Sequence, residues 1–321
     1  MSEPVVLLEG VTKRYAGHTA VQGLSLAVAP GAVYGLLGPN GAGKTTTMRM
    51  IMNIIAPDEG TVRVLGEPSG SRKLSPRVGY LPEERGLYKK MKVLDVLVFL
   101  AETKGIPRRA ARKRAAEWLD RLGLADWGLK KVDDLSKGMQ QKVQFISTVL
   151  HDPTVLILDE PFAGLDPVNS QVVKDTVLEL ARKGATVLFS THIMEHAEKL
   201  CDSVCIIARG EKVVDGPLAE VKRRHGGRQH VIVAVERGSE ALDRVWADRS
   251  LVAKAGNYGQ YAEVELADGA DPQRLLTAAL EAGARISKFE VAEPTLNQIF
   301  IDLVGPDAAR PAASGEGHAG A

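Results

Sequence analysis

The stretch Gly38-Pro39-Asn40-Gly41-Ala42-Gly43-Lys44-Thr45-Thr46 fits the pattern G-x-x-x-x-G-K-[ST]. It follows a Val- and Leu-rich run, residues 31–38, and precedes an apolar run with helical spacing, residues 45–56. Glycines allow backbone torsions that turn successive N–H groups toward one anion, and the start of the next helix adds positive charge. The spacing therefore predicts a phosphate-binding loop between a strand and a helix. In such a loop Lys44 reaches the β- and γ-phosphates of a nucleotide, and Thr45 binds Mg²⁺.

A second chemical feature is TVLILDE, residues 154–160, an apolar run that ends in Asp159 and Glu160. On its own, this ending is more typical of a strand that stops at the protein surface. In a chain that also has a phosphate loop, it favours a role in catalysis. We expect Asp159 to be a further ligand of Mg²⁺ and Glu160 to be the general base that polarises the attacking water.

The order of apolar runs around these motifs predicts an α/β fold with a mostly parallel sheet. Strand-like runs are expected at residues 5–9, 24–28, 31–38, 154–160, 185–191 and 203–210. Helical stretches at 169–183 and 193–200 separate the last three of these runs, and such alternation indicates parallel strands that are covered by helices. A helical insertion is expected from about Lys89 to Leu150.

The pattern restarts after a polar, basic segment at residues 217–228. From residue 230 onward the runs follow the order βαββαβ and end in a last helix, which predicts a small α+β domain of ferredoxin-like type. The final residues are rich in Gly, Ala and Pro and are expected to be disordered. We therefore expect an ATPase-type domain at 1–218 with a helical subdomain at about 89–151, an accessory domain at 219–304 and a tail at 305–321.

Composition excludes several classes of protein. The 321 residues carry a formal net charge of +1 and contain 5% aromatic residues, which argues against a nucleic-acid partner. Two cysteines cannot form a four-cysteine zinc site, and they fit a reduced cytosol. No apolar run approaches the ~18 residues of a spanning helix, and the N-terminus lacks the pattern of a signal peptide. A cytoplasmic location is expected.

Five motifs in a fixed order resemble one known family. They are GPNGAGKTT, LSKGMQQKVQ (135–144, here called the signature segment), LILDEP, GLDP (164–167) and STH (190–192). Residues 3–217 resemble the nucleotide-binding subunit of ABC transporters. The resemblance implies binding and hydrolysis of ATP with Mg²⁺, and a head-to-tail homodimer that encloses two ATP molecules.

The resemblance also implies roles for single residues. Ser136 and Gly138 of the signature segment would face the ATP of the opposite subunit, and Asp166 corresponds to the loop that crosses the dimer interface. The segment departs from the family at Lys137 and Met139, and LSKG also fits an ordinary helix N-cap. His192 corresponds to the family's switch histidine, which contacts the γ-phosphate, and Tyr15 to the aromatic residue that stacks on adenine. The alternatives are a loop histidine, a half-buried strand-end tyrosine and, for Asp166, a turn residue before Pro167.

Position 83 is a further departure from the family. A glutamine that binds Mg²⁺ normally stands there, whereas this chain has Glu83 in VGYLPEERGLY. A carboxylate can also bind Mg²⁺, but it adds negative charge beside the triphosphate. The resemblance implies Glu83 as a metal ligand, and the alternative is an exposed loop residue.

The C-terminal part resembles the extension of ATP-binding subunits of the ABC-2 exporter type, including the sodium-extrusion group. The implied function is an ATPase subunit that powers an exporter with separately encoded integral-membrane permease subunits. It would lie on the cytoplasmic face of the cell membrane. The alternative is an ABC ATPase that acts on ribosomes or DNA; such relatives carry second cassettes, coiled coils or zinc modules.

Overall fold

The computed structural model describes residues 3–84, 86–225, 229–237, 242–257, 261–292 and 294–305. This part of the chain divides into two compact units. The first runs up to Leu218 and takes in the chain from Leu303, and the second is Ala219–Asp302. The tail expected at 305–321 lies outside the described residues except for Gly305.

An antiparallel sheet forms one part of the first unit. In sheet order, its strands are β2 (His18–Val28), β1 (Val6–Tyr15), β4 (Glu59–Val64) and β5 (Glu67–Pro68). The strands expected at 5–9 and 24–28 are thus pieces of a longer hairpin. Gly10 has a φ of +59°, and the register of β1 against β2 shifts between Leu8 and Val11. Such a bulge interrupts the alternation of apolar residues, which explains why the sequence pattern shows only part of each strand.

A second, mostly parallel sheet carries the phosphate loop. In sheet order, its strands are β10 (Glu211–Pro217), β9 (Ser203–Ala208), β3 (Val33–Leu37), β8 (Thr186–Thr191), β7 (Val155–Asp159) and β6 (Val78–Leu81). Strands β3, β7 and β8 are buried at every residue, as expected of central parallel strands that are covered on both faces. Their carboxyl ends meet at one edge, which places the phosphate loop beside Asp159 and His192.

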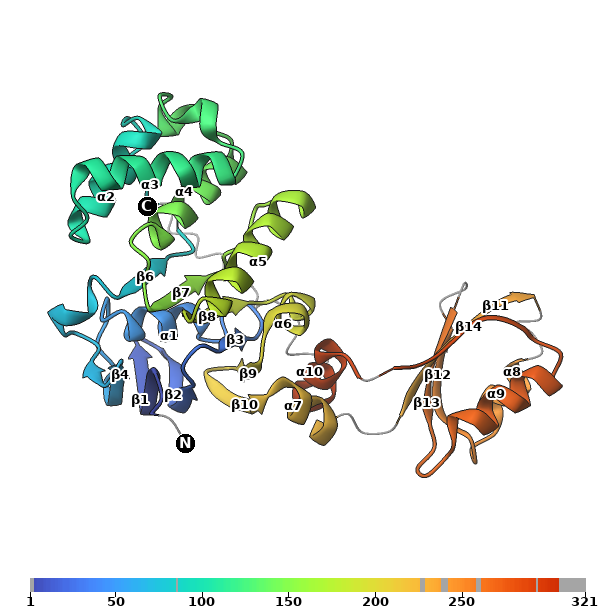
Figure 1. Ribbon diagram of the computed structural model, residues 1–321. Coiled ribbons are helices and arrows are strands. Elements are labelled where there is room, and N and C mark those ends of the chain that lie inside the picture. The colour runs from blue at the N-terminus through green and yellow to red at the C-terminus, as the bar shows by residue number, and fades with distance from the viewer. Residues whose placement is uncertain are drawn as a thin grey trace, which may run out of the picture. The chain divides into compact units, whose positions relative to one another are not determined.

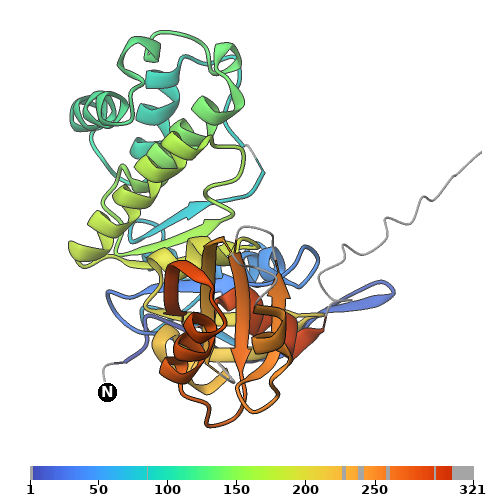
Figure 2. The ribbon, with the colours of Figure 1, turned by 90° about the vertical axis from the view of Figure 1, so that its right-hand side faces the viewer.

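Helices of the first unit pack on this sheet or form a separate group. The helices that follow sheet strands are α1 (Lys44–Ile51), α5 (Pro167–Arg182) and α6 (Met194–Leu200). The expected helical insertion contains α2 (Val93–Thr103), α3 (Arg108–Arg121) and α4 (Lys137–Val149), which gather at one end of the unit in Figures 1 and 2. Short 3-10 turns lie at Arg72–Leu74, Ala125–Trp127 and Val132–Asp134.

The second unit has the ferredoxin-like order. It consists of β11 (His230–Arg237), α8 (Leu242–Ala247), β12 (Val252–Asn257), β13 (Tyr261–Leu266), α9 (Pro272–Glu281) and β14 (Arg285–Ala292). The strands pair antiparallel in the order β12-β13-β11-β14. Buried residues from its strands and helices, such as Val231, Val264 and Leu275, form a core of its own. Helix α7 (Leu218–His225) precedes β11, and α10 (Leu296–Val304) follows β14.

No helix in the part of the chain that the structure describes is long and apolar enough to cross a membrane.

Candidate functional site

The phosphate loop connects β3 to α1, and two of its positions require glycine. A Cβ on Gly38 would lie 2.1 Å from the carbonyl oxygen of Ile207, and one on Gly43 would lie 2.4 Å from that of Ala20. Gly43 is also the N-cap of α1, with a φ of +104° in the left-handed region. The close approach of three backbone segments therefore explains the glycine pattern at these two positions.

A pocket of about 490 Å³ lies over this loop. Most of its lining was predicted from the sequence: Tyr15, Asn40, Gly41, Gly43, Lys44, Thr45, Thr46, Glu83 and Glu160. His18, Ala20 and Arg49 also line it, although the sequence did not single them out. Tyr15 and His18 are paired across the β1–β2 turn, and their rings stack with centroids 5.9 Å apart. The pocket therefore has a phosphate end at α1 and an aromatic end at the hairpin.

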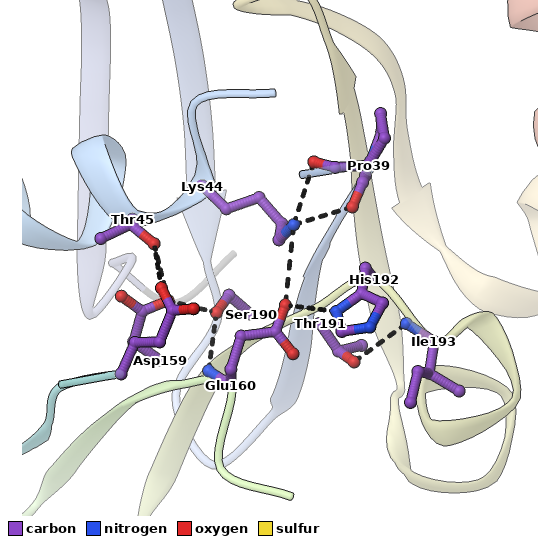
Figure 3. A network of polar contacts seen from close by, with 11 residues as sticks. Pro39, Lys44, Thr45, Asp159, Glu160, Ser190, Thr191, His192 and Ile193 are labelled. Atoms are coloured by element: carbon purple, nitrogen blue, oxygen red, sulfur yellow. Dashed lines mark hydrogen bonds and ion pairs between the residues drawn. The ribbon is translucent and has the colours of Figure 1, made fainter. Parts of the chain in front are cut away.

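Lys44 is buried at the phosphate end. Its Nζ donates to the carbonyl oxygens of Gly38 at 2.8 Å and Pro39 at 3.1 Å, and it lies 3.6 Å from Glu160 Oε1 (Figure 3). Burial lowers the pKa of Lys44, while the Glu160 and Asp159 carboxylates act in the opposite direction. Oxygen acceptors thus hold the ammonium group at the phosphate loop. Its positive charge and its N–H donors suit a phosphate group that binds there.

The residues predicted to hold Mg²⁺ lie together. Thr45 Oγ1 donates to Glu83 Oε2 and to Asp159 Oδ1, each at 3.3 Å. Burial raises the pKa of Asp159, and its Oδ2 is buried without a hydrogen-bond partner among the described residues. The described residues contain no group of three or more His, Cys, Asp or Glu that could hold a metal. Two carboxylates and a hydroxyl group are suitable ligands for Mg²⁺, which binds water and phosphate oxygens at its remaining coordination positions.

Glu160 has an unusual backbone that aims its side chain at Lys44. Its φ is +48°, in the left-handed region that non-glycine residues rarely adopt. Its side chain is near both Lys44 and His192, whose Nδ1 lies 2.9 Å from Glu160 Oε1 (Figure 3). The general base, the switch histidine and the phosphate-loop lysine predicted from the sequence therefore meet at one carboxylate.

Ser190 is a site residue that sequence reasoning missed. It lies at the end of β8 and pairs with Asp159 in parallel register. Its Oγ donates to Asp159 Oδ1 at 2.5 Å and accepts from the backbone N–H of Glu160 at 3.0 Å. The available signal was its place in STH, at the end of a strand expected in the same parallel sheet as the one that ends in Asp159. Ser190 thus orients both acidic residues.

Comparisons with known proteins identify the family. Residues 21–163 match the model for ABC transporters, and residues 216–304 match that for the C-terminal domain of DrrA1-3-like ATP-binding proteins. The chain is 44% identical over 308 residues to the ABC transporter ATP-binding protein YhaQ of Bacillus subtilis, covering 94% of this chain and 99% of that protein. The chain belongs to the ATP-binding subunits of ABC transporters.

Two further relatives agree with this assignment. The linearmycin resistance ATP-binding protein LnrL of Bacillus subtilis is 34% identical over 306 residues, covering 92% of this chain and 97% of that protein. A solved ATP-binding subunit of an ABC transporter is 29% identical, with a TM-score of 0.65, and covers 69% of this chain and 93% of that chain. The ABC ATPase domain and the ferredoxin-like extension are therefore one known combination. The chain is an ATP-hydrolysing subunit of a transporter.

The other residues that the ABC resemblance singled out lie outside the lining of this pocket. Ser136 is the N-cap of α4 and accepts from the N–H of Met139 at 3.3 Å. Asp166 is the N-cap of α5 and accepts from the N–H of Asn169 at 2.9 Å. A Cβ on Gly138 would lie 3.5 Å from the carbonyl oxygen of Gly164, so the signature segment and the GLDP loop are neighbours. The N-cap alternative expected for Ser136 therefore occurs, whereas Asp166 is the N-cap of α5 and not only a turn residue before Pro167.

Proposed function

We propose that this chain binds Mg²⁺ and ATP in the pocket over its phosphate loop and hydrolyses the γ-phosphate bond. The meeting of Lys44, Glu160 and His192 is the observation that carries the proposal. Lys44 holds the terminal phosphates, with backbone N–H groups of the phosphate loop around them. Thr45, Asp159 and Glu83 hold Mg²⁺, which neutralises charge on the phosphate oxygens. Tyr15 stacks on the adenine ring.

Glu160 acts as the general base in this proposal. Its carboxylate accepts a proton from the attacking water, and His192 keeps that carboxylate and the γ-phosphate aligned. Glu160 Oε1 lies 3.6 Å from Lys44 Nζ. Phosphate oxygens are stronger competitors for an ammonium group than a single carboxylate. Nucleotide binding therefore draws Lys44 away and leaves Glu160 to the water.

Two copies of the chain work as a head-to-tail dimer. Ser136, Gly138 and Asp166 lie outside the lining of their own pocket, and they form a second set of polar groups at the starts of α4 and α5. In the dimer this set covers the ATP of the partner. Residues 1–218, with the helical subdomain at about 89–151, provide both sets, and 219–304 form the accessory domain.

The dimer drives a permease in the cell membrane from the cytoplasmic side. A patch of apolar side chains on the helical subdomain supports this partner, because Tyr88, Phe99 and Leu129 are 52%, 42% and 68% exposed. Tyr88 and Phe99 pack edge to face with centroids 5.6 Å apart. Leu129 belongs to a segment whose backbone carbonyl oxygens accept hydrogen bonds from N–H groups in the first turn of α2. A short helix of a permease subunit would cover such a patch.

The direction of transport is export. LnrL carries resistance to linearmycin in its name, and removal of a compound from the cell is one way to confer resistance. To test the proposal, tagged Glu160→Gln protein is purified from membranes of its own host, and its partners are identified by mass spectrometry. A multi-spanning protein that co-purifies, and is absent with a tag alone, supports it. Ribosomal or DNA-bound partners without a membrane protein would contradict it.

The assignment of the pocket is tested by Lys44→Ala. This change removes the ammonium group at the phosphate end, so the affinity for ATP should fall by at least about tenfold. Lys73→Ala is a matched control, because Lys73 is exposed and pairs with Glu67 at 2.8 Å. Equal ATP affinity in both variants, measured by titration calorimetry, would remove Lys44 from the site.

A further inference from the structure

Lys142 is a buried lysine in the middle of α4 that none of the roles above uses. It is 7% exposed, and its Nζ donates to the carbonyl oxygen of Leu122 at 2.7 Å and to Asn169 Oδ1 at 3.0 Å. Burial lowers the pKa of Lys142, and the Asp166 carboxylate opposes that shift. A buried ammonium group is unfavourable unless acceptors surround it. The two acceptors come from different helices, so Lys142 joins the end of α3 and the start of α5 to α4.

The contact with Asn169 continues to Asp166. Asn169 Nδ2 donates to Asp166 Oδ2 at 2.5 Å, and the backbone N–H of Asn169 donates to Asp166 Oδ1 at 2.9 Å. The Asn169 side chain therefore uses its oxygen for Lys142 and its nitrogen for Asp166. The direction of each hydrogen bond in this series is determined, since an ammonium group can only donate and a carboxylate can only accept. Lys142 thereby orients the carboxylate at the start of α5.

The same helix carries Ser136 at its beginning. Residues 137–149 form a regular helix, so a side chain anchored at Lys142 also restrains the N-cap at Ser136. Gln141, next to Lys142, donates to the carbonyl oxygen of Pro161 at 3.4 Å. Ser136 and Asp166 are thus connected through the buried side of α4 rather than through the surface that they present to solvent.

We propose that Lys142 is a positioning residue that holds Ser136 and Asp166 as one rigid surface for the ATP of the partner subunit. The proposal rests on the function proposed above, in which these two groups face the opposite pocket. It deepens that function by naming a residue that contacts no nucleotide in either subunit. Lys142 acts through Asn169, and its removal should affect closure of the dimer and not the binding of ATP to the subunit that carries it.

The test uses the full-length chain with Glu160→Gln, which retains ATP. Dimer formation is measured by sedimentation at increasing ATP concentration, and ATP affinity is measured at protein concentrations too low for dimers. With Lys142→Met added, we expect dimer formation to weaken by roughly tenfold or more, while ATP affinity stays within about twofold. Lys142→Arg keeps the positive charge and should restore most of the dimer.

Lys104→Met provides a matched control. Lys104 is partly buried, its pKa is lowered by burial, and its Nζ donates to the carbonyl oxygens of Ser75 at 2.8 Å and Val78 at 3.3 Å. It has no described contact with Asn169 or Asp166. Dimer formation should therefore stay unchanged in this variant. An equal loss would mean that any weakening of the helical subdomain suffices, and it would overturn the proposal.

Two other results would also overturn it. The first is unchanged dimer formation with Lys142→Met, and the second is a parallel loss of ATP affinity. Asn169→Ala interrupts the same chain and replaces Lys142→Met if that variant does not fold. Failure of the underlying function looks different, because the Glu160→Gln chain alone would then form no dimer with ATP.

Discussion

At the scale of single residues, Glu160 shows how the backbone prepares the chemistry. Its left-handed conformation is costly for a residue with a side chain, by about 1–3 kcal/mol. The conformation is retained because Ser190 Oγ accepts from the N–H of Glu160 and because the carboxylate meets both Lys44 and His192. These contacts come from β8, the residue that follows it and the start of α1, so the rest of the fold stabilises the strained residue at the end of β7.

Glu160→Gln should retain ATP binding and lose turnover. The amide has nearly the same shape but cannot accept the proton of the attacking water, so the hydrolysis rate should fall roughly 10²- to 10⁴-fold. The measurement is phosphate release at saturating ATP. Glu84→Gln is the control, since Glu84 is an exposed neighbour of Glu83 whose side chain pairs with Arg49 at 3.1 Å. A Glu160→Gln variant with normal turnover would exclude Glu160 as the base.

Ser190→Ala should lower both stability and activity. The change leaves the buried N–H of Glu160 without its acceptor, which costs about 1–3 kcal/mol in the free energy of unfolding. It also releases Asp159, so the Mg²⁺ concentration needed for half-maximal turnover should rise. Urea denaturation and a Mg²⁺ titration check the two effects. Ser147→Ala, which removes a bond to the carbonyl oxygen of Gln144 within one helix, should change neither as much.

At the scale of elements, α4 contacts the loops of the site with several buried polar side chains. Gln141 reaches Pro161 after Glu160, and Gln144 donates to the carbonyl oxygens of Pro82 and Glu84 at 3.3 and 3.0 Å. Together with Lys142, these side chains explain why one face of a helix in the core is polar. The helical subdomain is therefore attached to the nucleotide site by hydrogen bonds and not only by apolar packing.

The end of α4 should make stability depend on pH. Burial, assisted by the nearby Lys104 ammonium group, lowers the pKa of His151 from 6.5 to about 4. The unfolded chain therefore binds more protons between these values, and the free energy of unfolding should fall as the pH drops from about 6.5 toward 4. Urea denaturation at a series of pH values should show a smaller slope in His151→Gln. His18→Gln, at an exposed histidine, serves as the control.

Part of that slope should remain in His151→Gln. Burial also lowers the pKa of His196 to about 4, with Lys174 and His192 acting in the same direction. The two partly buried histidines therefore destabilise the native state over the same pH window. An identical slope in His151→Gln and the wild-type chain would contradict the role of His151.

At the scale of the whole molecule, the second unit has a core of its own. Val231, Val233, Val264 and Leu266 on the sheet pack with Leu275 of α9. The fragment 219–302 should therefore fold alone and unfold cooperatively in urea, as many domains of this size do. Circular dichroism during denaturation measures this. Val264→Asp in the same fragment should abolish the transition, and a gradual transition in the unchanged fragment would contradict an independent core.

Local chemistry explains what could be predicted from the sequence. The glycines and Lys44 of the phosphate loop, the carboxylates at the end of β7 and the histidine after β8 all lie within a few residues of the strand or helix that positions them. Apolar periodicity indicated those strands and helices, so the parallel sheet, the helical insertion and the βαββαβ order were predicted correctly. The family resemblance added what no local pattern contains, namely the partner subunit and the permease.

Only the tertiary structure decided the contacts between distant segments. Ser190 reaches Asp159 across 31 positions because β8 pairs with β7 in one register, and Lys142 reaches Asn169 across 27 positions because α4 packs beside α5. Glu83 and Thr45 are likewise in contact although they are 38 positions apart in the sequence. Sequence patterns record the preferences of neighbouring residues. Strand order, register and helix packing depend instead on burial of the whole core, and they determine which of these polar groups meet.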